Sequence, residues 1–209
     1  MILTERDKSI IQEIARWRGV LGRHVKAIGK FQGTRATDRR LKKLVDEKLL
    51  TRKKYVYGLA GIYQVTRKAQ QMFGLDNYLG TIRLDQAVHD MAVVDTYLYF
   101  RSKYNLSEKD VISEKEIRHE QGFITRGHAP DFLYKKDGEL HCVEVELSQK
   151  AKERLEKNVA DNYVKYTSQI WVIPSSNKRV KIWIEEFATR YPNIEIIDMG
   201  VIDEFRDTA

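Results

Sequence analysis

The chain has 209 residues, which is enough for two small domains or one large one. It is 42% hydrophobic and 32% charged, and it contains no apolar run of the length that a membrane span requires. Its single cysteine, Cys142, excludes a disulfide within the chain and lies in an apolar segment typical of a protein core. These features, and a start that lacks the pattern of a signal peptide, predict a cytoplasmic protein with no membrane partner.

The charged residues are distributed unevenly along the chain. Residues 1–75 carry 18 Lys/Arg and 6 Asp/Glu, whereas residues 76–209 carry 19 Lys/Arg and 24 Asp/Glu. The resulting balances, +12 and −5, predict a basic domain over residues 1–75, a linker over 76–84 and a second domain over 85–209. A basic block of this density attracts polyanions through the release of counterions from phosphate groups. A merely solvated basic surface is the alternative, and charge alone does not separate the two.

The basic domain is predicted to contain three helices, two short strands and a closing helix. Ile10, Ile14 and Trp17 recur at helical spacing behind a capping pattern at Thr4 and Asp7, which predicts the first helix. The expected elements are helices at residues 4–18, 22–28 and 34–50, strands at 51–57 and 62–66, and a helix at 66–73.

The start of the third expected helix is basic and carries hydroxyl groups, with Thr34, Arg35, Thr37, Arg39 and Arg40 expected to point outward. With this order of elements, the stretch LKKLVDEKLLTRKKYVYG resembles the winged helix-turn-helix fold. The resemblance implies that the third helix enters the major groove of double-stranded DNA. Winged helices also bind proteins, so that alternative stays open. The residues expected to contact DNA are Arg35, Thr37, Arg39, Arg40 and Lys43 on the helix and Lys53 and Lys54 on the strand pair.

The second domain is predicted to alternate strands and helices. Apolar alternation and the turn sequence Lys136-Asp137-Gly138 predict a β-hairpin in its middle. The expected elements are a helix at residues 84–104, strands at 110–118, 131–136 and 139–147, a helix at 150–165, a strand at 168–173, a helix from 177 to 191 and a strand at 194–199.

Three carboxylates are expected to converge on this hairpin. Asp131 opens the first of its strands, and Glu144 and Glu146 lie on one face of the second because side chains alternate along a strand. Converging carboxylates repel one another unless a cation or a proton offsets their charge. The pattern therefore indicates a metal site.

The order of elements, together with Pro130-Asp131 and Glu144-Val145-Glu146, resembles the PD-(D/E)XK nuclease-like core. More narrowly, the stretches ISEKEIR, HAPDFLY, VEVELSQK and QIWVIP are similar to the replication-relaxation group of bacterial mobile-element proteins. These resemblances imply an α+β protein of two domains, with an N-terminal winged helix-turn-helix and a C-terminal restriction-endonuclease-like core that has a mixed sheet. They also imply DNA handling in the replication, relaxation or transfer of a plasmid or an integrated element.

The nuclease resemblance implies a role for each acidic residue. Asp131 and Glu144 would bind Mg²⁺ or Mn²⁺, with the Val145 carbonyl as a further ligand. A catalytic Lys is expected at position 146, where this chain has Glu146. Lys150, at the start of the following helix, would replace it, and Glu146 would then be a third acidic ligand or would pair with Lys150 or Lys152. The further residues considered for the site are Glu116, as an upstream acid on the first strand, and Glu114 on the same face of that strand.

Two functions remain open at this point. One is a metal-dependent DNA endonuclease or nickase directed by the winged helix. The other is a non-catalytic transcription regulator or relaxosome accessory protein, in which the nuclease-like domain serves dimerisation or partner binding. In that case the acids would form salt bridges with Lys150, Arg118 and Arg126. Expected partners are double-stranded DNA, a second copy of the chain, and a relaxase or replication protein.

Overall fold

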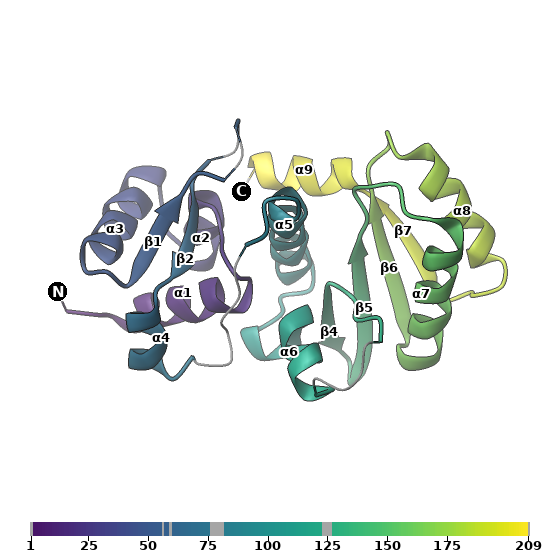
Figure 1. Ribbon diagram of the computed structural model, residues 1–209, viewed down its shortest axis with the longest axis horizontal. Coiled ribbons are helices and arrows are strands. Elements are labelled where there is room, and N and C mark those ends of the chain that lie inside the picture. Colours follow the sequence, from purple (N-terminus) through teal and green to yellow (C-terminus); the bar gives the residue numbers. More distant parts are fainter. Residues whose placement is uncertain (1, 56, 59, 76–81, 123–126, 209) are drawn as a thin grey trace. The chain divides into compact units, whose positions relative to one another are not determined.

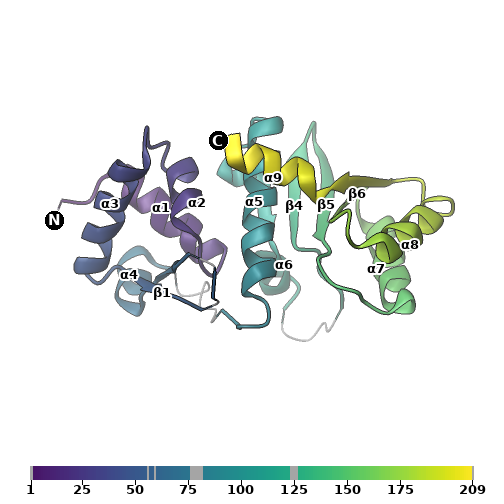
Figure 2. The same cartoon turned by 90° about the horizontal axis from the view of Figure 1, so that it is seen from above.

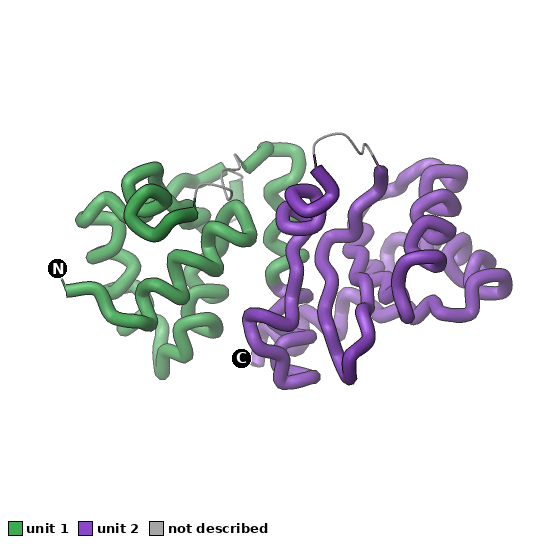
Figure 3. The backbone as a smooth tube through the Cα atoms, turned by 90° about the horizontal axis from the view of Figure 1, so that it is seen from below, with its two compact units in different colours: residues 1–94 green, residues 95–209 purple. Residues whose placement is uncertain are grey.

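The computed structural model describes residues 2–55, 57–58, 60–75, 82–122 and 127–208. The chain divides into two compact units, residues 1–94 and 95–209 (Figure 3). The division falls inside helix α5 (Ala87–Lys103). Residues 76–81 of the expected linker lie outside the described residues. Within the described ranges, no helix is long and apolar enough to cross a membrane.

Unit 1 contains the helices and strands expected from the sequence. Its elements are α1 (Glu5–Arg16), α2 (Gly22–Ile28), α3 (Thr34–Asp46), β1 (Leu50–Lys53), β2 (Ile62–Val65) and α4 (Arg67–Phe73). The strands β1 and β2 pair in antiparallel fashion, and an isolated bridge joins Val20 to Tyr63 of β2. The third helix and the first strand end earlier than expected, at Asp46 and Lys53.

The first helix shows how the sequence fixes these elements. Thr4 and Asp7 form a capping box, in which each side chain binds the backbone N–H of the other residue. Ile10, Ile11 and Ile14 follow on one face and are fully buried. The cap fixes the start of α1, and the apolar face of this helix contributes to the core of unit 1.

Unit 2 is built on a mixed sheet of five strands in the order β3-β4-β5-β6-β7. The first three strands are antiparallel, and β5, β6 and β7 run parallel. The strands are β3 (Val111–Ser113), β4 (Phe132–Lys136), β5 (Glu139–Val145), β6 (Ser168–Ile173) and β7 (Ile194–Asp198). Besides the second half of α5, the helices are η2 (Glu108–Asp110), α6 (Glu114–Glu120), α7 (Lys152–Lys165), α8 (Lys178–Ala188) and α9 (Met199–Thr208).

Helices cover both faces of this sheet. Figures 1 and 2 show α7 and α8 on one face, with α9 and α5 on the other. On the first face, Leu155 and Phe187 pack in one buried cluster with Trp171 of β6. On the second, the rings of Phe100 and Phe132 lie 6.2 Å apart. The core of unit 2 therefore consists of two apolar layers separated by the sheet.

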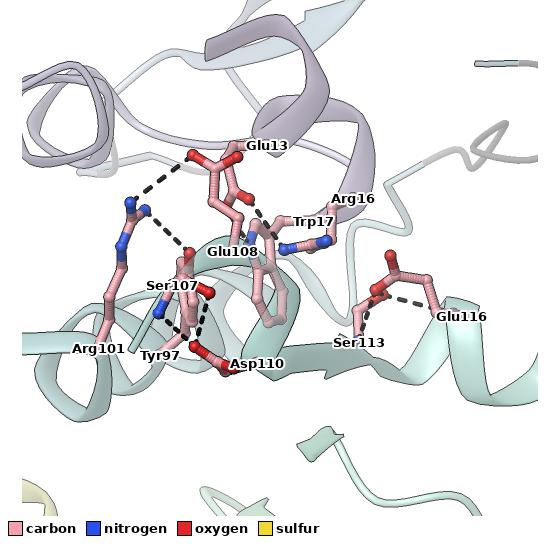
Figure 4. Close-up of polar contacts among 10 residues, drawn as sticks. All are labelled: Glu13, Arg16, Trp17, Tyr97, Arg101, Ser107, Glu108, Asp110, Ser113 and Glu116. Carbon is pink, nitrogen blue, oxygen red and sulfur yellow. Dashed lines mark hydrogen bonds and ion pairs between the residues drawn. The ribbon is translucent and has the colours of Figure 1, made fainter. Parts of the chain in front are cut away.

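The strand expected at residues 110–118 is wrong. The strand β3 ends at Ser113, and α6 begins at Glu114. The Ser113 hydroxyl accepts a hydrogen bond from the Glu116 N–H, and Glu116 accepts from the Ser113 N–H and hydroxyl (Figure 4). This capping box starts a helix where a continuing strand had been expected.

The expected hairpin is confirmed. Its strands β4 and β5 pair from Phe132↔Val143 to Lys136↔Glu139. The turn residues Asp137 and Gly138 both have positive φ, at 53° and 85°. Tight hairpin turns require this conformation, which glycine and aspartate adopt at low cost.

Candidate acidic site and nucleic-acid interface

The hairpin places Asp131 beside Glu144. Continuing the register of the strand pair by one residue sets these two residues opposite each other on one face of the sheet. The Asp131 carboxylate accepts a hydrogen bond from the Val145 backbone N–H at 2.7 Å. The structure thus brings together two of the three carboxylates in the expected acid cluster.

Glu144 is buried, with 5% of its surface exposed. Its Oε1 contacts the His128 imidazole and accepts a hydrogen bond from the Asn162 amide of α7 at 2.9 Å. Within the described part of the chain, no hydrogen bond engages Oε2. Burial and the neighbouring Asp131 charge raise the pKa of Glu144, and the bonds from His128 and Asn162 do not fully offset them. The ionised carboxylate is therefore costly at this position.

Glu146 is also buried, but it has a cationic partner. Its Oε1 accepts hydrogen bonds from the Ser148 N–H at 3.3 Å and the Ser148 hydroxyl at 3.1 Å. The Lys150 ammonium forms an ion pair with Oε2. Lys150 precedes α7, which begins at Lys152, so the expectation that it opens this helix is wrong. The cation expected to replace the catalytic Lys is held by Glu146.

Glu116 and Glu114 do not join this cluster as strand residues. Both lie on α6, where Glu116 caps the helix and Glu114 accepts a hydrogen bond from Arg118 at 2.8 Å. Arg126, the other cation considered as a partner for the acids, lies outside the described residues.

The donor set at Asp131 and Glu144 fits a hard divalent cation. Among the residues that the structure describes, no group of three or more His, Cys, Asp or Glu side chains could hold a metal ion. Mg²⁺, however, usually takes one or two carboxylates and completes its shell with water and substrate phosphates. Oxygen ligands also suit Mn²⁺. The two carboxylates are therefore sufficient for a hydrated Mg²⁺ or Mn²⁺ ion and insufficient for an all-protein cage.

In unit 1, four exposed cations gather on one side of α3, next to the exposed acidic residues Asp38 and Asp46. Arg35, Arg39 and Lys43 follow one another at intervals of one helical turn, and all three are exposed as expected. Lys42 is exposed beside them and was not among the expected contacts. None of these four cations forms an ion pair within the described residues. We call these four residues the basic face of α3.

The expectation that Thr37 and Arg40 point outward from α3 is wrong. Thr37 is buried, and its hydroxyl donates a hydrogen bond to the Gly33 carbonyl at 3.1 Å. Arg40 turns toward α1, where its guanidinium binds both oxygens of Asp7, with a distance of 2.6 Å from Nε to Oδ1. Burial opposes ionisation of Asp7, but the hydrogen bonds from Arg40 and Thr4 outweigh it and lower the pKa of Asp7. These residues stabilise unit 1.

The two expected contacts on the strand pair are exposed. Lys53 ends β1 and Lys54 follows it. Arg52, between Thr51 and Lys53, lies with its guanidinium 5.6 Å from the Tyr63 ring centroid and is exposed as well. The strand pair therefore continues the basic character of unit 1 beyond α3.

Sequence reasoning missed His128 and Asn162. His128 lies only three positions before Asp131, and this proximity was the available signal. Asn162 falls at helical spacing from Leu155 and Val159, so it is a polar residue on the buried stripe of α7. A polar side chain on an apolar stripe indicates a buried hydrogen-bond partner, here Glu144.

Comparisons with protein-family models, curated proteins and solved structures returned no match for this chain.

Proposed function

We propose that this chain is a DNA-binding protein whose second unit holds Mg²⁺ or Mn²⁺ at Asp131 and Glu144 and cleaves or nicks DNA there. The observation that carries the proposal is the carboxylate pair itself. Asp131 directly precedes β4 and lies opposite Glu144 when the strand register is continued by one residue, and Glu144 is buried with a raised pKa. Such costly groups concentrate at functional sites, and a divalent cation would offset their repulsion.

The basic face of α3 supports DNA as the partner. Like charges one turn apart on a helix destabilise it, so Arg35, Arg39 and Lys43 cost free energy in the absence of an anion, and the exposed Asp38 and Asp46 offset only part of that cost. Phosphate groups would remove that cost. The order of three helices and an antiparallel strand pair supports a winged helix-turn-helix, in which the third helix enters the major groove.

The element order of unit 2 supports a nuclease-like core. An antiparallel meander of β3, β4 and β5 leads through α7 to the parallel strand β6, with α6 inserted between β3 and β4. Asp131 directly precedes the second strand, and Glu144 lies near the end of the third. These are the positions at which the PD-(D/E)XK resemblance implies metal ligands. A cation held there would polarise the scissile phosphate.

The ion pair between Lys150 and Glu146 favours a second candidate function. Because Lys150 neutralises a buried carboxylate, it does not point freely toward a substrate. A non-catalytic protein, either a transcription regulator or a relaxosome accessory protein, would need no further cation at the site. Unit 2 would then serve partner binding or dimerisation.

The resemblance to the replication-relaxation group suggests a setting for either function. On this proposal the protein acts in the cytoplasm, in the replication, relaxation or transfer of a mobile genetic element. Homodimerisation on paired half-sites and contact with a relaxase or replication protein stay predictions.

The two candidates are separated by incubating the full-length protein with supercoiled plasmid in Mg²⁺, in Mn²⁺ or in EDTA. The nuclease proposal predicts metal-dependent nicking that Asp131→Ala and Glu144→Gln abolish without weakening DNA binding. Glu116→Ala is the matched control and should nick normally, because Glu116 caps α6. If the wild type binds DNA but nicks with neither metal, the non-catalytic candidate holds. Absence of DNA binding contradicts both.

A further inference from the structure

The first turn of α8 carries three cations and no acidic residue. Lys178, Arg179 and Lys181 are all exposed. The N-terminus of a helix bears a partial positive charge, so cations there cost free energy. The three cations therefore do not stabilise the start of α8, and an anion bound there would offset their cost.

The fold places these cations at the edge of the sheet where the parallel strands end. The strands β5, β6 and β7 run parallel, so α7 and α8 begin at the same edge. Ligands of such sheets bind outside this edge. The Asn177 amide donates a hydrogen bond to the Ser148 carbonyl at 3.1 Å, which joins the start of α8 to the segment after Glu146. The cations thus follow directly on a residue that contacts the segment after Glu146.

Asn177 also leaves the start of α8 incomplete. It occupies the N-cap position, but its side chain makes no capping hydrogen bond. Its Oδ1 has no hydrogen-bond partner within the described residues, although only 7% of the residue is exposed. This oxygen is a hydrogen-bond acceptor, so a water molecule or another donor at the start of α8 would satisfy it. The uncapped N–H groups of α8 and the three cations are the features that favour an anion there.

Two of the cations are available to such a ligand. Lys178 and Arg179 form no ion pair within the described residues. The Arg179 guanidinium lies 4.7 Å from the Trp183 ring centroid, which holds its planar group in place while leaving its edge N–H groups for an acceptor. Arginine in this arrangement matches the geometry of a phosphate group.

We propose that Lys178, Arg179 and Lys181 bind phosphate groups of the DNA strand that enters the site of Asp131 and Glu144. The inference rests on the proposed function, because it takes DNA as the partner. These contacts recognise the phosphodiester backbone and carry no sequence preference. They form a second DNA-binding surface in addition to the basic face of α3.

The test uses the full-length protein with a labelled duplex in EDTA, so that neither cleavage nor metal binding contributes. Fluorescence anisotropy over a salt series compares the wild type with Lys178→Glu/Lys181→Glu. The helix dipole favours Glu at these positions, so the variant retains its fold. For each phosphate that the variant no longer neutralises, the slope of log affinity against log salt should become shallower by about 0.9. We expect roughly tenfold weaker binding and a slope shallower by about 2.

Lys135→Glu/Lys136→Glu provides the matched control. These exposed residues end β4 at the opposite edge of the sheet, next to the hairpin turn. The control variant should bind DNA more tightly than the α8 variant and with nearly the wild-type salt slope. Equal affinities and slopes for the two variants would overturn the inference and leave the proposed function standing. A wild type that does not bind the duplex overturns both.

Discussion

The basic face of α3 and the acidic site of the sheet hold their charges in opposite ways. Arg35 and Arg39 are exposed and form no ion pair within the described residues. Glu144 and Glu146 are buried, and each carboxylate has polar partners. An exposed charge costs little and can meet a large partner from solvent, whereas a buried carboxylate is costly and accommodates only a small cation. Contact with a large polyanion thus requires exposed charges, whereas a small cation can be held by buried ones.

The same contrast exists within α3, between two neighbouring arginines. Arg39 is exposed, whereas the guanidinium of Arg40 binds Asp7 at the start of α1. The Arg40 side chain is 21% exposed and that of Asp7 only 1%. Adjacent residues of one type therefore serve two purposes, and only the structure distinguishes them.

The largest expected effect separates these two arginines. Arg40→Ala leaves the Asp7 carboxylate buried without its cation, which should lower the free energy of unfolding by about 3 kcal/mol. Arg39→Ala should change it by less than about 0.5 kcal/mol and instead weaken DNA binding. Urea denaturation and anisotropy measure the two quantities. Equal free energies of unfolding for the two variants would contradict the different roles assigned to Arg39 and Arg40.

The Arg40 effect should depend on pH, because the pKa of Asp7 is lowered in the folded state. A lowered carboxyl pKa adds stability above the unfolded pKa of about 3.9 and loses it as pH falls through the folded value. Thermal melts of wild type and Arg40→Ala should therefore begin to converge at about pH 3.9 and should coincide below the lowered pKa of Asp7. If the difference in melting temperature between wild type and Arg40→Ala stayed constant at acid pH, this would argue against the ion pair.

The next effect concerns the pair in the acidic site. Lys150→Ala removes the cation that neutralises buried Glu146 and should cost about 2 kcal/mol. The double variant Lys150→Ala/Glu146→Gln should recover most of this loss, since no buried charge is left unpaired. Lys152→Ala is the control, because Lys152 pairs with exposed Glu186 at the surface. Additive losses in the double variant would show that the two residues are not coupled.

A smaller and opposite effect is expected at Glu144. Its raised pKa means that the ionised carboxylate destabilises the fold at neutral pH, so Glu144→Gln should raise the free energy of unfolding by about 1 kcal/mol. The folded state binds the proton more tightly, so this gain should disappear as pH falls below about 4.3, where Glu144 is protonated in both states. Melting curves at neutral and acid pH provide the measurement. A destabilised variant at neutral pH would contradict the expectation.

The smallest effect distinguishes a cap from a site residue. Glu116→Ala breaks the capping box of α6 and should cost about 0.5 to 1 kcal/mol. Arg118→Ala on the same helix is the control for its surface salt bridge. Neither substitution should alter metal binding. If Glu116→Ala lost metal affinity and Arg118→Ala did not, Glu116 would belong to the acidic site.

Much of the fold follows from local signals in the sequence. Capping at Thr4, helical spacing of Ile10 and Ile14, and the turn at Asp137-Gly138 each fix an element through neighbouring residues. The strand expected at 110–118 was wrong because Ser113 and Glu116 form a capping box that starts a helix within this range. The hydrogen bonds of such a cap compete with the continuation of a strand.

The candidate site was predicted only in part, because its partners come from distant segments. Asp131 and Glu144 were placed together by a hairpin, whose register is local. The contacts of Asp7 with Arg40 and of Glu144 with Asn162 join separate elements, and no pattern of spacing identifies which residue is the partner. Tertiary packing decides such pairs, which is why Arg40 was expected on the DNA-binding surface.

The most direct measurement of the central claim is isothermal titration of Mn²⁺ into the full-length protein. If Asp131 and Glu144 hold a divalent cation, the wild type and Glu116→Ala should each bind Mn²⁺ at a site that Asp131→Asn and Glu144→Gln lack. Bound metal should also raise the melting temperature of the wild type. It should leave the melting temperatures of Asp131→Asn and Glu144→Gln unchanged. A wild type without Mn²⁺ binding, or equal binding by Glu144→Gln, would contradict the claim.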